Sequence, residues 1–161
     1  MISNSRIGKN CVINASQVYD SVVEAGASVG PFSHIRPQSH IGPEVHIGDF
    51  VEVKNSTIGE KTSVSHLTYI GDSDVGKGCN FGCGVVTVNY DGEKKNRTTV
   101  GDYCFVGCNS NLVAPVTLGD GAYTAAGSTI TKDVPADALA VARARQENKE
   151  GWAQKKLEAY K

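Results

Sequence analysis

The feature that most constrains this chain is an aliphatic residue that recurs every six positions and is often followed by glycine. The period holds from residue 29 to residue 53, and it returns from residue 100 to residue 130 with one weak position at Thr124. An α-helix repeats its apolar face every 3.6 residues and a β-strand every 2, so neither element alone explains a period of six. A six-residue repeat is typical of a parallel β-helix. Antiparallel hairpins are the alternative, but hairpins do not keep this period over so long a stretch.

In such a β-helix each repeat forms one side of a triangular coil, and its aliphatic residue fills the interior. The composition agrees with this architecture, because 18 glycines suit tight corners and 7% aromatic residues suit a narrow prism. We therefore expect an all-β chain in which residues 1–132 form a parallel β-helix domain and residues 133–161 form a C-terminal arm. Within that arm, residues 152–161 are expected to form a short helix.

Two kinds of interruption break the period. The step between aliphatic residues shortens to five from Val53 to Ile58 and again from Ile70 to Val75. Residues 88–99 hold no periodic aliphatic residue, and they carry an Asp-Gly turn signal and a basic stretch. We interpret residues 88–99 as a loop ejected from one corner, which is either a solvated surface loop or a binding loop on a rigid scaffold.

The charge and the cysteine content exclude several classes of protein. The 16 basic and 17 acidic residues give a formal charge of −1, without the basic excess of a nucleic-acid-binding or membrane-surface protein. No apolar run approaches the roughly 18 residues needed to span a bilayer, and no signal peptide is recognisable. Five cysteines without a secretory signal favour free thiols in a reducing compartment, so we expect a cytoplasmic protein.

The periodicity also predicts which outward residues stack on one another. If Val64, Phe81, Val106 and Thr124 fill equivalent interior positions, the residues two places further along form one outward column, which is His66, Cys83, Cys108 and Ala126. Neighbouring coils lie about 4.8 Å apart, so this column extends over roughly 15 Å. It begins at a histidine, the side chain best suited to proton transfer near neutral pH, and continues over small residues. The sequence therefore predicts a groove headed by a general base.

Two sets of residues resemble metal ligands, but we expect no metal site. The pairs Cys79/Cys83 and Cys104/Cys108 have the spacing of a thiolate site. In the predicted register, however, the first member of each pair points inward and the second points outward. The histidines at positions 34, 40 and 46 are six residues apart, which places them on three different sides of a coil.

Eight motifs carry a resemblance to a known family. In order along the chain they are GPFSHIRP at 30–37, FVEVK at 50–54, HLTYIGD at 66–72, NFGCG at 80–84, VNYDGEKK at 88–95, FVGCNSNLVAPV at 105–116, AAGSTITKDVP at 125–135 and ALAVARARQENKEGW at 138–152. Over about residues 29–152 the chain resembles the C-terminal acetyltransferase domain of the bacterial bifunctional N-acetylglucosamine-1-phosphate uridylyltransferase/glucosamine-1-phosphate N-acetyltransferases, a hexapeptide-repeat acyltransferase family. The nucleotidyltransferase domain of that family has no counterpart in this sequence, so a protein made of this chain alone is expected to lack uridylyl transfer.

The resemblance implies a homotrimer of left-handed β-helices with acetyl-CoA bound between neighbouring subunits. It implies acetyl transfer to the amine of glucosamine 1-phosphate, giving N-acetylglucosamine 1-phosphate, a precursor of peptidoglycan and lipopolysaccharide. His66 matches the catalytic base of the family. The sugar-phosphate positions of the family match Arg36, Lys54, Tyr69 and Asn80, the positions around the acyl donor match Cys83, Asn89, Tyr90, Cys108, Ala126 and Arg143, and two further basic positions near the ligands match Lys95 and Lys149.

The residue types fit this chemistry. Only a free amine attacks a thioester, so His66 is expected to remove a proton from the amine, and Glu52 on the preceding coil is a candidate to orient the imidazole. Arg36 and Lys54 supply positive charge for the sugar phosphate. A backbone N–H near Cys83 or Asn89 is the expected donor to the oxyanion. We favour direct transfer over an acyl-enzyme on a cysteine.

Two other functions stay open from the sequence. One is a related hexapeptide acyltransferase that acts on another amino sugar or a nucleotide sugar, and the other is a β-helix scaffold without activity. The cysteines at 83 and 108 depart from the family pattern, because some members carry alanine at the first position and serine at the second. We expect no Mg²⁺ dependence, since in this family the metal belongs to the uridylyltransferase half.

Overall fold

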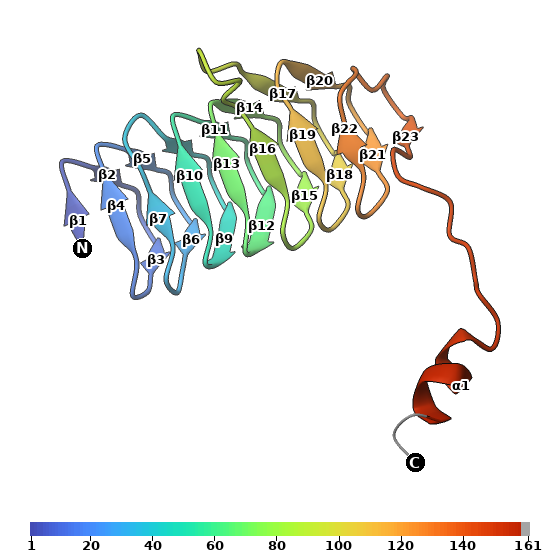
Figure 1. Ribbon diagram of the computed structural model, residues 1–161. Helices are drawn as coiled ribbons and strands as arrows, with labels where there is room; N and C mark the ends of the chain where they lie inside the picture. The colour runs from blue at the N-terminus through green and yellow to red at the C-terminus, as the bar shows by residue number, and fades with distance from the viewer. Residues whose placement is uncertain (159–161) are drawn as a thin grey trace.

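The structure is a computed structural model that describes residues 1–158, apart from the side chain of Lys155, and it is a left-handed parallel β-helix with three flat sides (Figure 1). The first sheet holds β1 (Ile2–Ser3), β4 (Gln17–Tyr19), β7 (His34–Ile35), β10 (Glu52–Lys54), β13 (Tyr69–Gly71), β16 (Val86–Val88), β19 (Asn111–Val113) and β22 (Thr129–Ile130). The second sheet holds β2 (Arg6–Ile7), β5 (Val22–Val23), β8 (His40–Ile41), β11 (Thr57–Ile58), β14 (Ser73–Val75), β17 (Thr98–Val100) and β20 (Val116–Leu118). The third sheet holds β3 (Val12–Ile13), β6 (Ser28–Val29), β9 (His46–Asp49), β12 (Ser63–His66), β15 (Asn80–Phe81), β18 (Phe105–Val106), β21 (Tyr123–Thr124) and β23 (Leu139–Ala140).

The interior of the prism is a ladder of aliphatic side chains, one from each strand of a coil. Ile35 pairs with Val53 and Val53 with Ile70 in the first sheet, and all three are fully buried. The strands alternate side chains in and out, so a single inward residue per short strand is enough to build this core. The predicted six-residue period and the all-β fold class are therefore confirmed.

Two positions of the aliphatic ladder are occupied by threonines, Thr87 and Thr124, and the hydroxyls of both form hydrogen bonds. Thr87, opposite Leu112 in the register, accepts a hydrogen bond at Oγ1 from the backbone N–H of Gly71 at 2.8 Å. Thr124 accepts one at Oγ1 from the backbone N–H of Gly107 at 3.0 Å. A buried hydroxyl is tolerated when it is paired in this way, which explains why the aliphatic period weakens at Thr124 without a break in the fold.

The ejected loop is shorter than the sequence suggests and covers residues 89–97. Val88 still pairs with Val113 at the end of β16, and Thr98 already pairs with Val116 at the start of β17. Both residues therefore belong to parallel β-strands. The sequence pattern assigned them to the loop because neither one falls on the six-residue aliphatic period. The predicted turn is present: the Asp91 carboxylate accepts hydrogen bonds from the backbone N–H groups of residues 93 and 94. These bonds lower the pKa of Asp91 to about 2.

The coil continues past residue 132, where the aliphatic period ends. Leu118 forms a bridge with Val134, and β21 pairs with β23 at Leu139 and Ala140. Val134 and Ala140 occupy these last positions and are unevenly spaced, so the six-residue period did not predict them.

The chain then leaves the solenoid as an exposed arm that ends in α1 (Trp152–Leu157), as Figure 1 shows. The helix expected over residues 152–161 is thus present in its first part, and residues 159–161 lie outside the described residues. Among the described residues, no helix has the length and apolar character required to cross a membrane.

Candidate active site

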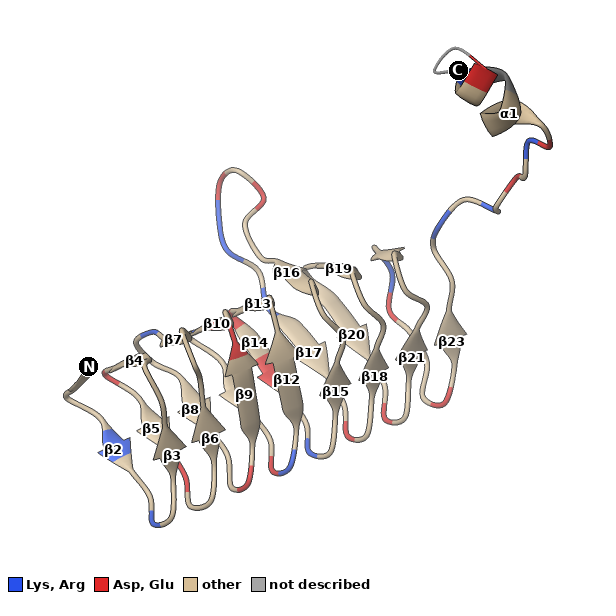
Figure 2. Ribbon diagram, turned by 90° about the horizontal axis from the view of Figure 1, so that it is seen from below, with Lys and Arg blue, Asp and Glu red and all other residues tan. Residues whose placement is uncertain are grey.

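Two corners of the prism carry the candidate site. The chain passes from the third sheet to the first at one corner, which we call the histidine corner because His66 lies there at the end of β12. It passes from the first sheet to the second at another corner, which we call the loop corner because residues 89–97 project from it, as Figure 2 shows. The first sheet lies between these two corners.

The predicted outward column forms at the histidine corner. Val64, Phe81, Val106 and Thr124 pair in register, and backbone hydrogen bonds continue this register into the turn. The carbonyl oxygen of Cys83 accepts from Asn109 at 2.8 Å, and that of Cys108 accepts from Gly127 at 2.8 Å. We call His66, Cys83, Cys108 and Ala126 the corner column. His66 is exposed, so its imidazole is available to a ligand and is not sealed inside the prism.

The partner expected for this imidazole is bonded elsewhere. Glu52 lies on β10 opposite Tyr69, and its carboxylate accepts a hydrogen bond from Arg36 Nη1 at 2.7 Å. The register places Asp49, not Glu52, beside His66 on the preceding coil. Glu52 follows the turn and belongs to the sheet face, whereas His66 still belongs to the corner. An orienting role for Glu52 therefore stays a prediction.

Three of the four predicted sugar-phosphate residues, together with Lys95, gather on the first sheet and toward the loop corner. Lys54 lies on β10, Tyr69 lies on β13, and Arg36 directly follows β7. Lys95 reaches this group from the ejected loop. Contact with Lys95, burial and the charge of Arg36 lower the pKa of Lys54. Contact with Lys54 and the charges of Asp72 and Tyr69 raise the pKa of Lys95. Arg36, Lys54 and Lys95 together form a cluster of positive charge on this surface.

A buried carboxylate that the sequence analysis did not single out joins this cluster. Asp72 accepts hydrogen bonds from Asn55 Nδ2 and from Asn89 Nδ2, both at 2.6 Å, and Asn89 Nδ2 lies 3.2 Å from the Tyr69 hydroxyl. Burial alone raises the pKa of Asp72, but the two hydrogen bonds and the charges of Lys95 and Lys54 outweigh it and lower that pKa. The only sequence signal was its place in the motif HLTYIGD, directly after a glycine.

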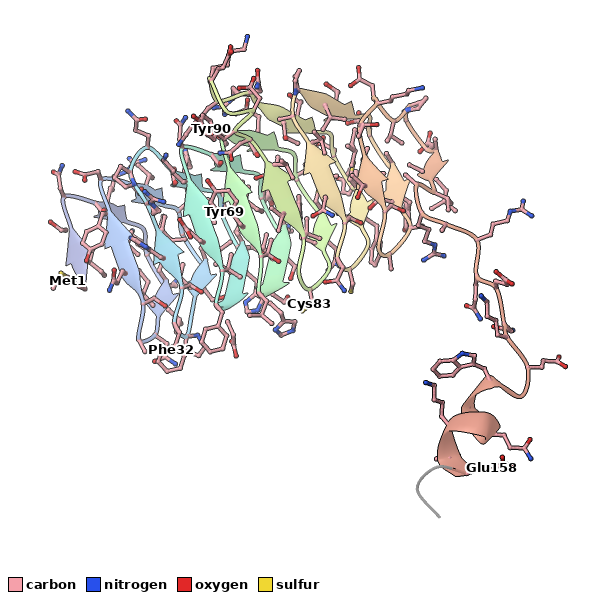
Figure 3. The ribbon with its side chains drawn as sticks, viewed as in Figure 1. Met1, Phe32, Tyr69, Cys83, Tyr90 and Glu158 are labelled. Carbon is pink, nitrogen blue, oxygen red and sulfur yellow. The ribbon has the colours of Figure 1, made fainter. Side chains whose placement is uncertain are left out.

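Other predicted residues lie away from this cluster in one copy of the chain. Asn80 is exposed on β15, which belongs to the third sheet. Tyr90 projects at the loop corner and Cys83 lies at the opposite edge of the first sheet, with Tyr69 between them (Figure 3). Arg143 binds the column through its Nη1, which donates to the carbonyl oxygen of Ala126 at 2.6 Å, and Lys149 is exposed in the arm. The predicted residues are thus spread over two sheets, two corners and the arm.

The residues considered as metal ligands diverge as the register predicted. Cys79 and Cys104 are buried in the prism, whereas Cys83 is half-buried and Cys108 is exposed. Contact with Cys104 and burial raise the pKa of the Cys79 thiol. His34, His40 and His46 lie on β7, β8 and β9, which belong to three different sheets.

Family models match most of the solenoid. Residues 17–90 match the model described as the GMPPB C-terminal domain, and residues 97–132 match the bacterial transferase hexapeptide, a model of six repeats. The bifunctional protein GlmU of Clostridium botulinum type A is 57% identical over 155 residues, and that of Clostridium acetobutylicum is 59% identical over 155 residues. Each alignment covers 96% of this chain but 34% of the relative. The chain therefore spans about a third of the length of the curated relatives it matches.

Solved structures agree with the fold at low sequence identity. A mutant of perosamine N-acetyltransferase from Caulobacter crescentus, solved in complex with CoA and GDP-perosamine, has a TM-score of 0.63 at 18% identity and covers 76% of this chain and 66% of its own. The polySia-specific acetyltransferase NeuO has a TM-score of 0.53 at 19% identity and covers 99% of this chain and 94% of its own. With the repeat, the register and the GlmU relatives taken together, this chain belongs to the hexapeptide-repeat transferases and corresponds to the C-terminal third of the bifunctional GlmU proteins.

Proposed function

We propose that this chain transfers an acetyl group from acetyl-CoA to the amine of glucosamine 1-phosphate. The observation that carries the proposal is the corner column, in which an exposed imidazole heads a row of small side chains in register. The row extends over roughly 15 Å, which suits an extended pantetheine arm. The relatives at 57–59% identity support the acceptor, because GlmU proteins match the chain over 96% of its length.

The proposed reaction is a direct transfer. His66 accepts a proton from the substrate amine as the nitrogen attacks the thioester carbonyl carbon. The C–N bond forms, the tetrahedral oxyanion is held by a backbone N–H, and the C–S bond breaks as the CoA sulfur leaves and takes up a proton. The atoms balance without a covalent enzyme intermediate, and the proposal uses no metal. Cys83 and Cys108 then serve as small walls of the donor groove, not as nucleophiles.

The charge cluster suits the phosphate of the acceptor. Arg36 and Lys54 with Lys95 present up to three cations on one side of the first sheet, while Glu52 is paired with Arg36. A phosphate dianion would draw the two lysines together by relieving their mutual repulsion. Binding of this dianion is therefore expected to raise the pKa of Lys54 from its lowered value.

The spread of the predicted residues supports a site shared between subunits. Asn80 faces outward from the third sheet, whereas Lys54 lies at the far edge of the first sheet. Both residues reach one ligand if the third sheet or the histidine corner of one copy faces the first sheet of another. We propose a homotrimer in the cytoplasm, with the arm and its Arg143 and Lys149 contributing to the acyl-donor side.

The test is a transfer assay with labelled acetyl-CoA that detects the acetylated sugar phosphate. Product is measured directly because Cys108 is an exposed free thiol, which is expected to react with reagents that detect released CoA. His66→Ala is expected to lower kcat by about 10²-fold or more. The matched control is His46→Ala, which removes an exposed histidine of the same sheet whose Nδ1 lies 2.8 Å from the Ser28 hydroxyl. Unchanged turnover in His66→Ala would exclude His66 as the base.

An acceptor panel decides between the remaining functions. We expect glucosamine 1-phosphate to be acetylated faster than other amino sugars or nucleotide sugars, and turnover to continue after chelation of divalent cations. Faster acetylation of another acceptor would assign the chain to a related acyltransferase. No acetylation of any acceptor by the wild-type protein would favour a scaffold.

A further inference from the structure

The loop corner holds a buried carboxylate, Asp72, whose position is fixed by hydrogen bonds. Asp72 is 6% exposed, and each of its two oxygens accepts one hydrogen bond at 2.6 Å from a different asparagine. Its backbone N–H also donates to the carbonyl oxygen of Lys54 at 2.9 Å, and its own carbonyl oxygen accepts from Thr98 at 3.2 Å. A buried carboxylate without such partners would be costly. Asp72 is therefore held on both sides.

The two asparagines connect Asp72 to both ends of the ejected loop. Asn89 begins the loop, and its carbonyl oxygen accepts a hydrogen bond from the N–H of Asn96 at 2.7 Å. Asn55 lies on an earlier coil, and its carbonyl oxygen accepts from Arg97 Nη1, near the end of the loop, at 3.3 Å. The carboxylate thus joins the start of the loop directly and its end through one further residue.

The same amide also reaches the predicted acceptor site. Asn89 Nδ2 donates to Asp72 Oδ2 and lies 3.2 Å from the hydroxyl of Tyr69, so one amide group serves both partners. The phenol of Tyr69 lies over Gly71, where any Cβ would meet it. The orientation of the Tyr69 hydroxyl is therefore set by the asparagine, and the orientation of the asparagine is set by the carboxylate.

We propose that Asp72 is a positioning residue of the acceptor site, which acts through Asn89 to fix the Tyr69 hydroxyl and the base of the loop. This inference rests on the proposed acetyl transfer. Asp72 touches no substrate in the proposed reaction. It fixes groups that do, and a small misplacement of such groups is costly in catalysis.

The first variant is Asp72→Asn, which keeps the shape of the side chain. Its amide offers one oxygen and one NH₂ group to the two asparagines, so either Asn55 or Asn89 must flip its own amide to present an oxygen to residue 72, and the orientation of Asn89 is no longer fixed. We expect the KM for glucosamine 1-phosphate to rise about tenfold while kcat stays within about twofold. A purely structural defect would lower the active fraction, and therefore kcat, and would leave KM unchanged.

The decisive variant exchanges the two partners as Asn55→Asp with Asp72→Asn. Residues 55 and 72 both have positive φ, 46° and 50°, which asparagine and aspartate both tolerate. In the exchanged pair the amide of residue 72 donates to the new carboxylate and its oxygen accepts from Asn89, so every hydrogen bond is restored. We expect the KM to return to within about threefold of wild type. An exchanged protein no better than Asp72→Asn would overturn the proposal.

A double-mutant cycle with Asn89→Ala checks the route of the effect. If Asp72 acts through Asn89, Asp72→Asn changes KM less than about twofold once Asn89 is alanine. Equal effects of Asp72→Asn in both backgrounds would contradict the proposal.

A measurement without substrate separates this inference from the proposed function. In the free protein, the side-chain amide signal of Asn89 in a ¹⁵N NMR spectrum should shift in Asp72→Asn and return in the exchanged pair. If the chemical shift of the Asn89 amide is the same in wild type and in both variants, Asp72 does not position Asn89, even if acetyl transfer is confirmed. Wild-type protein that acetylates no acceptor would defeat the proposed function, and the amide signal would still decide whether Asp72 fixes Asn89.

Discussion

The two corners that border the first sheet are built in opposite ways. At the histidine corner, neighbouring coils touch through their backbones, and the side chains of the corner column are small or exposed. At the loop corner, the chain departs from the repeat with an ejected loop, and polar side chains there form hydrogen bonds to the buried carboxylate of Asp72. The difference shows that a regular repeat makes an open groove, whereas a specific polar site requires a departure from the repeat.

The largest expected effect concerns access to thiols at the histidine corner. Cys108 is exposed, whereas Cys104, four residues earlier, is 1% exposed inside the prism. We expect Cys108 to be alkylated at least about 10³-fold faster, because Cys104 reacts only when the coil opens. Peptide mass spectrometry over a time course of iodoacetamide measures both rates. Equal rates would mean that the last coils open freely in solution.

The second effect concerns backbone packing at the same corner. A Cβ on Gly107 would collide with the carbonyl oxygen of Thr124 and would lie 2.7 Å from the backbone N of Ala126. Gly107→Ala is expected to lower the free energy of unfolding by about 3 kcal/mol, at the upper end of the cost of overpacking. The matched control is Gly127→Ala, where nothing lies within 4 Å and only the positive φ of 72° opposes the change. If Gly127→Ala proves the more destabilising in urea unfolding, close coil contact does not dominate at this corner.

The third effect is the acid dependence of the loop corner. The pKa of Asp72 is lowered in the folded protein, relative to about 3.9 in an unfolded chain. Its contribution to stability is therefore fully present above about pH 3.9 and is lost as the pH falls through the folded value. The difference in urea midpoint between wild type and Asp72→Asn should shrink between pH 6 and pH 3. Asp20→Asn, an exposed aspartate at the same corner, is the control and should show a smaller difference at pH 6.

The smallest effect concerns the ion pair at the end of the loop. Arg97 Nη2 lies 2.7 Å from Asp74 Oδ1, and both side chains are about half exposed. An exposed pair of this kind contributes roughly 0.2–1 kcal/mol. Arg97→Ala should speed hydrogen exchange in residues 89–97 and leave the melting temperature of the solenoid within about 2 °C. A large fall in that temperature would show that the loop supports the coils beneath it.

The regular part of the molecule was predictable from the sequence because one physical rule governs it. A narrow interior admits one aliphatic side chain per short strand, so the residues that fill it also fix the register, and the register placed His66 above Cys83, Cys108 and Ala126. The cysteine and histidine positions followed from the same rule.

The irregular part was not predictable because side chains decide it one at a time. Nothing in the period marks Asp72, whose role depends on amides from Asn55 and Asn89 that are distant in the sequence. The resemblance identified Asn89 but not its partner, and Glu52 was expected beside His66 although its carboxylate accepts a hydrogen bond from Arg36. The end of the coil was missed because Val134 and Ala140 break the spacing.

The ejected loop has a consequence for how the length of this chain can change. From Thr87 to Leu112 the chain takes 25 residues to complete one circuit, and from Leu112 to Ile130 it takes 18. A single residue added within a strand would turn the side chains that follow it in that strand to the opposite face. Residues added at Gly92, where no other group lies within 4 Å of the place that a Cβ would take, extend only the tip of the loop. An epitope tag or a fluorescent label inserted there would leave the register of the three sheets intact.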